Sequence, residues 1–263
     1  MKMRNILITL ALLACICTSA LSELKSSDAA WRSASDHEKL KMSPCHWDET
    51  GRYVRSYTPG APQLGTCYRP GHPGPAGGII VYHKHDGFTV QGYGNPGGLG
   101  YFASYTAYYL EAMPDSTLTN IAWSTTRTKI DGITTFFSAD DPLASLIGNG
   151  RRDTQLLVNH FTRTGQRGTA AQRCADYSKT NSGTVYRDWF LPSAGEMNEI
   201  YTMQGQVAWL SPQRGSAWFW TSSQTDTNYA WQQHTHGDWR YPRNLFGGFK
   251  ANAVGNVRPV RAF

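Results

Sequence analysis

Asp188-Trp189-Phe190-Leu191-Pro192-Ser193 is the stretch that decides the fold of this chain of 263 residues. Its apolar centre predicts a short buried strand that ends at the proline, because proline disfavours helical backbone at the residue before it. Ser193 and Glu196 then match a capping box, in which the two residues satisfy free N–H groups at the start of a helix. The helix that begins here should turn Met197 and Ile200 into the core.

Two more helices are predicted upstream of this stretch. One apolar face, ending before Gly165, is made by Leu156, Leu157, His160 and Phe161. Thr169 and Gln172 match a further capping box, which opens a helix through Tyr177. Helices therefore occupy the middle of the chain.

Strands are predicted on both sides of the helices. β-branched and aromatic runs mark them at residues 79–82, 108–110, 219–222, 229–232 and 257–261. Large aromatic side chains at strand positions belong in the core, which makes Trp189, Phe190, Trp220 and Trp231 scaffold residues. The order of elements indicates an α+β fold of small twisted antiparallel sheets with two or three helices and long loops.

The composition is that of a folded domain. The chain is 40% apolar and 13% aromatic but only 17% charged, which excludes a disordered chain, a collagen and a coiled coil. Without Lys2 and Arg4, which belong to the export signal described next, the net charge falls from +6 to +4. Arginines scattered through loops argue against nucleic acid as a partner.

Residues 1–22 carry a secretory signal. Lys2 and Arg4 precede an apolar run over residues 6–17, which is shorter than the roughly 20 residues of a membrane-spanning helix. Leu12-Leu13-Ala14-Cys15 resembles a bacterial lipobox and favours a lipid anchor at Cys15. The alternative is a soluble secreted protein cut near Ser22. Either way the protein is exported and works in the cell envelope, at the outer surface or in the medium.

Residues 23–74 are predicted to form a polar stalk, which spaces residues 75–263 from the membrane. In an oxidising compartment Cys45 and Cys67 can form a disulfide across this Pro- and Gly-rich span. Cys174 is then the odd cysteine, and we expect a buried, unpaired thiol on a helix.

Several short sequence motifs, by their order and spacing, resemble those of one known family. They are residues 74–80, 188–193 with Glu196, 219–223, 230–231 and 257–261. Together they resemble the C-terminal domain of Lcl-type collagen-like adhesins, in the superfamily of C-type-lectin-like and formylglycine-generating-enzyme-like domains. The resemblance covers residues 75–263. It implies a C-type-lectin-like fold in which the N- and C-terminal strands pair and the C-terminal third forms an exposed binding face.

The same superfamily contains oxidases, so an enzyme is the alternative function. The formylglycine-generating oxidases hold copper on a pair of cysteines in the C-terminal part, and this chain has none after Cys174. Relatives also pair the equivalent of Cys174 with a W-G-C segment, where this chain has Trp123-Ser124-Thr125. We interpret Glu196 as a helix cap and Glu199 as a solvated helix residue, so no catalytic carboxylate pair, and hence no enzyme, is expected.

No metal or cofactor is expected either. His83 and His85, like His234 and His236, place two imidazoles on one strand face, but without an obvious third ligand they are interpreted as surface histidines. Asp226 and Asp238 supply too little oxygen for calcium.

Residues 224–256 are the predicted binding surface, for a protein or a glycan on another cell or surface. This segment combines rigid aromatics, amides and arginines, as binding surfaces do. The candidate ligand contacts are Asp226, Asn228, Tyr229, Gln232, His234, His236, Asp238, Trp239, Arg240, Tyr241, Arg243, Asn244 and Phe246.

The residue types of this segment are those expected of a diversified protein sequence. Codons of the type NNY cannot encode Glu, Met, Lys, Gln or Trp, and between His234 and Asn256 only Trp239 and Lys250 break that rule. Variable proteins of diversity-generating retroelements, which include relatives of this domain, are mutated in this way. A variable protein and a fixed adhesin both remain open.

Overall fold

The chain divides into two compact units, Met1–Cys67 and Tyr68–Phe263. A computed structural model describes residues 68–114, 118–204, 217–235, 244–251 and 255–263. It also describes the backbone of two short antiparallel strands, β1 (Cys45–Trp47) and β2 (Tyr53–Arg55). The predicted signal and lipobox, and the partner cysteine Cys67, lie outside the described residues.

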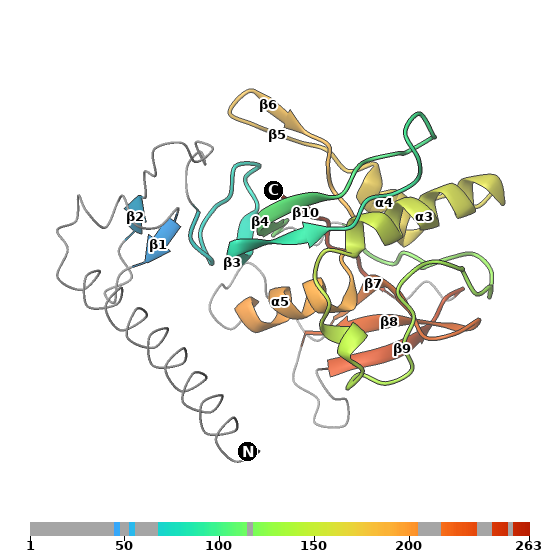
Figure 1. Cartoon of the computed structure of the whole chain (residues 1–263). Coiled ribbons are helices and arrows are strands. Elements are labelled where there is room, and N and C mark those ends of the chain that lie inside the picture. The colour runs from blue at the N-terminus through green and yellow to red at the C-terminus, as the bar shows by residue number, and fades with distance from the viewer. Residues whose placement is uncertain are drawn as a thin grey trace, which may run out of the picture. The chain divides into compact units, whose positions relative to one another are not determined.

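The second unit is a mixed α+β fold, as the sequence predicts (Figure 1). Its described elements are β3 (Ile79–Val90), β4 (Tyr105–Ala112), the 3-10 helix η1 (Pro142–Ser145), α3 (Gly150–Arg163), α4 (Ala170–Ala175), β5 (Lys179–Asn181), β6 (Thr184–Tyr186), α5 (Ala194–Gln204), β7 (Trp218–Gln224), β8 (Tyr229–His234), β9 (Leu245–Phe249) and β10 (Val260–Ala262). They form three small antiparallel sheets, β10-β4-β3, β5-β6 and β7-β8-β9. α5 lies between the two three-stranded sheets and contacts both.

The C-terminal strand closes the first sheet. β10 pairs with β4, Val260 lying opposite Ala112, and β3 pairs with the other edge of β4. The carbonyl of Phe263, the last residue, accepts hydrogen bonds from the backbone N–H groups of Tyr108 and Tyr109. The expected direct pairing of the first and last strands is therefore wrong, because β4 separates them.

Three consecutive apolar residues at the start of β3 are all buried, which regular alternation would not allow. Ile79, Ile80 and Val81 are each at most 2% exposed. The register with β4 shifts between Ile80 and Tyr82, and such a bulge turns neighbouring side chains toward the interior.

The stretch 188–193 is a buried connector in place of the strand predicted for it. Phe190 alone forms a bridge, exchanging backbone hydrogen bonds of 2.8 and 3.0 Å with Val260. The backbone N–H of Leu191 donates to Thr154 Oγ1 of α3 (2.9 Å). Since Pro192 and the helix that follows end the extended run, the stretch links sheet to helix without widening the sheet.

Both predicted capping boxes are confirmed. In α4 the Thr169 and Gln172 side chains cap the first turn, although the helix ends at Ala175 rather than Tyr177. At α5 the Ser193 N–H donates to Glu196 Oε2 (2.7 Å), and the Glu196 N–H donates to Ser193 Oγ (3.3 Å).

The predicted scaffold aromatics are confirmed as core residues. Trp220 is fully buried and packs in one cluster with Trp123, Leu157 and Phe161. The other three scaffold residues, Trp189, Phe190 and Trp231, are each at most 6% exposed.

β9 was not predicted, because its sequence, Leu245-Phe246-Gly247-Gly248-Phe249, holds two glycines and strands disfavour glycine. The strand forms because it pairs with β8 along its whole length. A side chain at Gly248 would overlap Gln232 Oε1 and come within 2.8 Å of Trp220, so the glycine lets β9 approach the core.

Candidate functional site: two surfaces of the second unit

Seven of the predicted ligand contacts lie among the described residues, in or beside β8 and β9. They are Asp226, Asn228, Tyr229, Gln232, His234, Asn244 and Phe246. The other six, His236, Asp238, Trp239, Arg240, Tyr241 and Arg243, lie outside the described residues, as does most of the loop between β8 and β9.

One face of the β7-β8-β9 sheet carries an aromatic cluster near its edge. The β7–β8 register sets Trp218 opposite His234, with ring centroids 4.3 Å apart, and the Phe246 ring on β9 lies 5.4 Å from Trp218. Phe246 is 39% exposed whereas His234 is 9% exposed. The structure thus brings two predicted contacts together, with Phe246 as the more exposed side chain.

Three predicted contacts are buried instead of exposed, and His234 is one of them. Gln232 is 3% exposed, and its side chain fills the space left by the missing side chains of Gly248 and Gly255. Asn244 is also buried, at the start of β9. All three were assigned to the surface because polar residues were assumed to face solvent, but in the case of Gln232 the backbone of β9 at Gly248 lies against the side chain.

The other face of the same sheet presents a second aromatic pair. Tyr229 and Phe249 lie opposite each other, 4.5 Å between ring centroids, and the Arg127 guanidinium lies 5.0 Å from the Phe249 centroid. Asp226 Oδ1 accepts the backbone N–H groups of Asn228 (2.7 Å) and Tyr229 (2.9 Å). The Asp226 carboxylate therefore shapes the turn that presents Tyr229.

Lys250 stabilises that turn through hydrogen bonds to backbone carbonyls. Its Nζ donates to the backbone carbonyls of Thr128 (2.8 Å) and Asp226 (2.7 Å) and to Gln224 Oε1 (2.7 Å). The ammonium lies 4.7 Å from the centroid of the Trp123 ring, and burial lowers the pKa of Lys250 to about 8. Sequence reasoning missed this role, although Lys250 is the one lysine after Met203.

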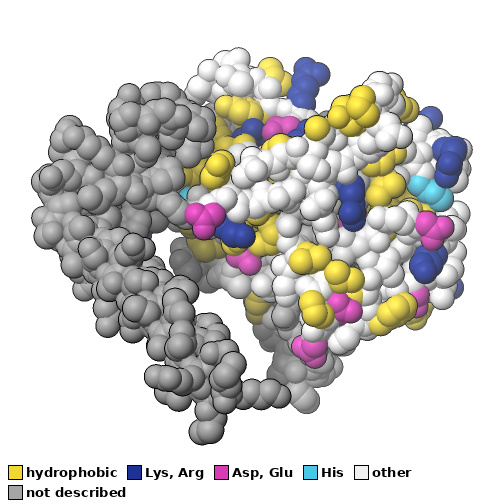
Figure 2. All heavy atoms as spheres, viewed as in Figure 1, with side chains coloured by type: hydrophobic (Ala, Val, Ile, Leu, Met, Phe, Trp, Pro, Cys, Tyr) yellow, Lys and Arg dark blue, Asp and Glu magenta, His cyan; other side chains and the backbone are white. Residues whose placement is uncertain are grey.

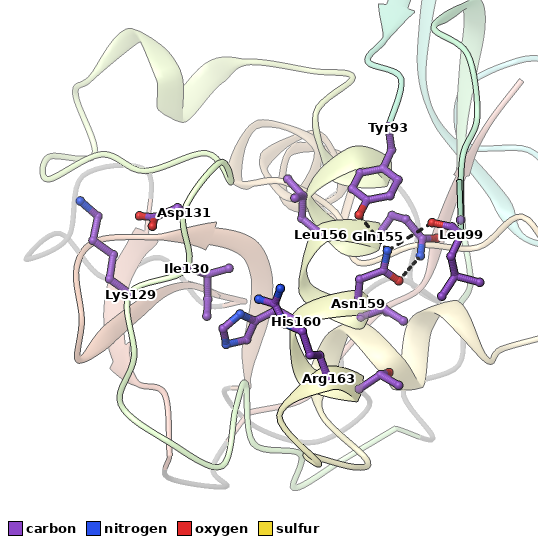
Figure 3. Close-up of a pocket in the computed structure, with 13 residues that line it drawn as sticks. Tyr93, Leu99, Lys129, Ile130, Asp131, Gln155, Leu156, Asn159, His160 and Arg163 are labelled. Atoms are coloured by element: carbon purple, nitrogen blue, oxygen red, sulfur yellow. Dashed lines mark hydrogen bonds between the residues drawn. The ribbon is translucent and has the colours of Figure 1, made fainter. Parts of the chain in front are cut away.

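A separate groove of about 880 Å³ runs along the outer face of α3. Figure 3 shows Tyr93, Leu99, Gln155 and Asn159 gathered on one side and the segment 129–131 on the other, with His160 and Arg163 between them. Sequence reasoning missed this groove as well, because the sequence showed only the apolar face of α3. The polar face carries residues of the groove at positions 155, 159 and 163, which share one side of a helix.

The histidine pairs do not form a metal cluster in the described part of the chain. The His83 ring stacks on Tyr109 (4.8 Å between centroids). The His234 ring is tilted against Trp218 and is buried, so its interpretation as a surface histidine is wrong. The His85 and His236 side chains lie outside the described residues. Among described side chains, no group of three or more His, Cys, Asp or Glu is placed to hold a metal ion.

The two glutamates of α5 are more buried than the sequence suggested. Glu196 is fully buried, and besides capping α5 its Oε1 accepts the Gly148 N–H (2.8 Å). Burial raises the pKa of Glu196 to about 7, although backbone donors oppose the shift. Glu199 is half-buried and burial raises its pKa, so its interpretation as a solvated residue is wrong.

Cys174 is a buried, unpaired cysteine on α4, as predicted. Burial raises the pKa of its thiol well above the ordinary value, which leaves the thiolate scarce at neutral pH.

Comparison with known proteins adds no assignment: neither a family model nor a curated protein matches this chain. Within the described residues, no helix is long and apolar enough to cross a bilayer. The fold therefore defines the class only as a mixed α+β domain.

Proposed function

We propose that this chain is an exported, lipid-anchored surface protein that binds a protein or glycan through its C-terminal third and catalyses no reaction. We further propose that residues 75–263 adopt a C-type-lectin-like fold related to the C-terminal domain of Lcl-type adhesins. The closure of the domain by its C-terminal strand, and the small sheets joined by long connections, support the fold proposal.

One observation carries the binding proposal: aromatic side chains line the edge strand β9 above a rigid aromatic core. Phe246 and Phe249 are each 39% exposed, on opposite faces of β9, while Trp220 and Trp231 are buried on the two faces of the same sheet. Exposed aromatics on a rigid base offer contact area at little entropic cost. Figure 2 shows apolar side chains reaching the surface between few, dispersed charges, as suits a surface of low charge content.

The proposal predicts a loss of binding without a loss of stability. Alanine at Trp239 and Tyr241 together, or at Phe246, should abolish attachment to ligands found on glycan and protein arrays, because these rings are the apolar anchors. The melting temperature should change by less than about 3 °C. Phe137→Ala is the control, since Phe137 is exposed but lies outside the C-terminal third.

Two results would contradict the proposal. A large drop in melting temperature for the Trp239 and Tyr241 variants would assign those rings to the core. Stoichiometric copper binding at Cys174 with turnover of a thiol peptide would establish an oxidase. The buried Cys174 thiol supports the proposed non-catalytic function over the oxidase.

The hypothesis of a variable protein is tested at the gene. A near-duplicate of the 3′ end, differing only at adenines and lying beside a reverse transcriptase gene, is its expected signature. Absence of that repeat would leave a fixed adhesin.

A further inference from the structure

The α3 groove has one wall that is already held in place. Asn159 Nδ2 donates to the Tyr93 hydroxyl (2.8 Å) and to the Leu99 carbonyl (3.3 Å), and Gln155 Nε2 donates to Asn159 Oδ1 (2.9 Å). Gly100 has a φ of +75°, and a side chain there would overlap the Gln155 amide. The loop 93–100 is thus fixed against α3, and a ligand need not order this wall.

This wall retains one donor and one acceptor for a ligand. The Tyr93 oxygen accepts from Asn159, so its own hydrogen remains free to donate. Gln155 Oε1 makes no hydrogen bond within the described part of the chain. A donor beside an acceptor matches the C=O and N–H of an extended peptide.

The middle of the groove is an aliphatic slot. Half-buried Leu156 of α3 lies on one side of it and Ile130 of the facing segment, which is 4% exposed, on the other (Figure 3). Tyr93 and His160 carry the only rings among the side chains that line the groove, and no Trp or Phe is among them. Aliphatic walls suit an aliphatic side chain better than a sugar ring, which favours an aromatic face.

The groove also carries cationic side chains. Arg163 and Lys129 line it together with a single carboxylate, that of Asp131, and none of the three is in an ion pair within the described residues. Burial, with Arg163 and Lys250 nearby, lowers the pKa of His160, so the imidazole is neutral at pH 7. Because the Arg163 guanidinium is in no ion pair within the described residues, it can receive a carboxylate.

From these features we propose that the α3 groove is a second binding site, which takes an extended peptide segment carrying an aliphatic side chain next to an Asp or Glu. The aliphatic side chain occupies the slot between Ile130 and Leu156, the carboxylate meets Arg163, and the backbone pairs with Tyr93 and Gln155. The groove volume of about 880 Å³ is near the upper end of ligand cavities, roughly 300–1,000 Å³, which suits several residues. This site does not depend on the binding face of the C-terminal third.

The test is selection of a random heptapeptide phage library on the purified full-length protein. Selected peptides should be enriched in Asp or Glu adjacent to Leu, Ile or Val, and the best of them is then synthesised and titrated by fluorescence anisotropy. Arg163→Gln should weaken its binding about tenfold, since it removes the cation that meets the carboxylate, and Tyr93→Phe about threefold, since it removes both a donor to the peptide and the acceptor of the Asn159 amide.

Two controls separate this site from the rest of the molecule. Arg173→Gln removes an exposed cation of α4 that does not line the groove, and it should leave peptide binding unchanged. Trp239→Ala should also leave it unchanged, so that failure of the groove and failure of the proposed C-terminal face are distinguishable.

Four outcomes would overturn the inference. The library yields no enriched peptide, or the enriched peptides lack the acidic and aliphatic pair, or Arg163→Gln binds them as well as the unmodified protein does. Stronger binding of a uronic-acid oligosaccharide than of the peptide would instead assign the groove to a glycan, which also overturns it.

Discussion

The carboxyl group of Glu196 organises the start of α5 and the loop before α3. It accepts backbone N–H groups of Ser193 (2.7 Å) and Gly148 (2.8 Å), and Gly150 also donates to it. A side chain at Gly150 would overlap Glu196 Oε2. One buried carboxyl group therefore positions two segments, and its protonation influences the stability of both.

Burial raises the pKa of Glu196 from 4.5 to about 7, which predicts a pH-dependent stability. The folded state then holds the proton more tightly than the unfolded state, so this stabilisation is fully present below about pH 4.5 and is lost as pH rises through about 7. Relative to Glu196→Gln, the unfolding free energy of the unmodified protein should fall by about 3 kcal/mol across this range.

Urea denaturation at several pH values between 4.5 and 8 checks this prediction. Glu199→Gln is the matched control on the same helix and should change the profile less, because Glu199 is only half-buried. Parallel pH profiles for the unmodified protein and Glu196→Gln would show that Glu196 keeps an ordinary pKa.

At the scale of the element, β9 can pair with β8 next to the core because Gly248 has no side chain. Strands normally disfavour glycine, but β9 pairs with β8 at five consecutive positions and its Gly248 lies against Gln232 and Trp220. The approach of β9 decides which residues of the C-terminal third are buried. Gln232 is covered while Phe246 remains partly exposed.

The two glycines of β9 should respond differently to alanine. A methyl group at Gly248 would overlap the Gln232 side chain, whereas at Gly247 the nearest atom is 3.5 Å away, an ordinary contact. Gly248→Ala should lower the unfolding free energy by about 1–3 kcal/mol. Gly247→Ala should change it by less than about 1 kcal/mol, and thermal denaturation of the two variants measures the difference. Equal effects would show that β9 does not pack against the core in this way.

At the scale of the whole molecule, one arginine joins three distant segments. Arg261 of β10 pairs with both carboxylate oxygens of Asp188 (2.9 and 3.0 Å) and with Oε2 of Glu111 on β4 (3.1 Å). Glu111 also accepts the N–H groups of Ala76 (3.0 Å) and Gly78 (2.7 Å). The C-terminal strand, the 188–193 stretch and the first turn of the domain thus meet at one buried charge cluster.

Loss of Arg261 should destabilise the entire domain. Arg261→Met leaves the Glu111 carboxylate, which is fully buried, without its cation, at a cost of about 3–5 kcal/mol. Arg187→Met is the control, because Arg187 is exposed beside Asp188. Calorimetry of both variants is the measurement. A melting temperature for Arg261→Met close to that of the control would show that the cluster does not hold the segments together.

Much of the fold was predictable because its signals are local. Capping boxes join residues three positions apart, and aromatic runs at residues 219–222 and 229–232 need only the two-residue period of a strand. Trp220 and Trp231 could be assigned to the core because a large apolar side chain at a strand position is almost always covered. The burial of Cys174 could be predicted in the same way, because it is a small apolar side chain on a helix face.

Which residues form the two candidate binding surfaces could not be predicted, because exposure depends on tertiary structure. Gln232 has a polar side chain, but the pairing of β9 with β8 places Gly248 against it and buries it, and that pairing joins residues 12 or more positions apart. The α3 groove likewise needs the 93–100 loop and the 129–131 segment to meet a helix. The sequence by itself therefore determined the starts of α4 and α5, most strands and the aromatic core, because neighbouring residues define them. The tertiary structure decided which side chains face solvent, because exposure depends on what lies across the fold.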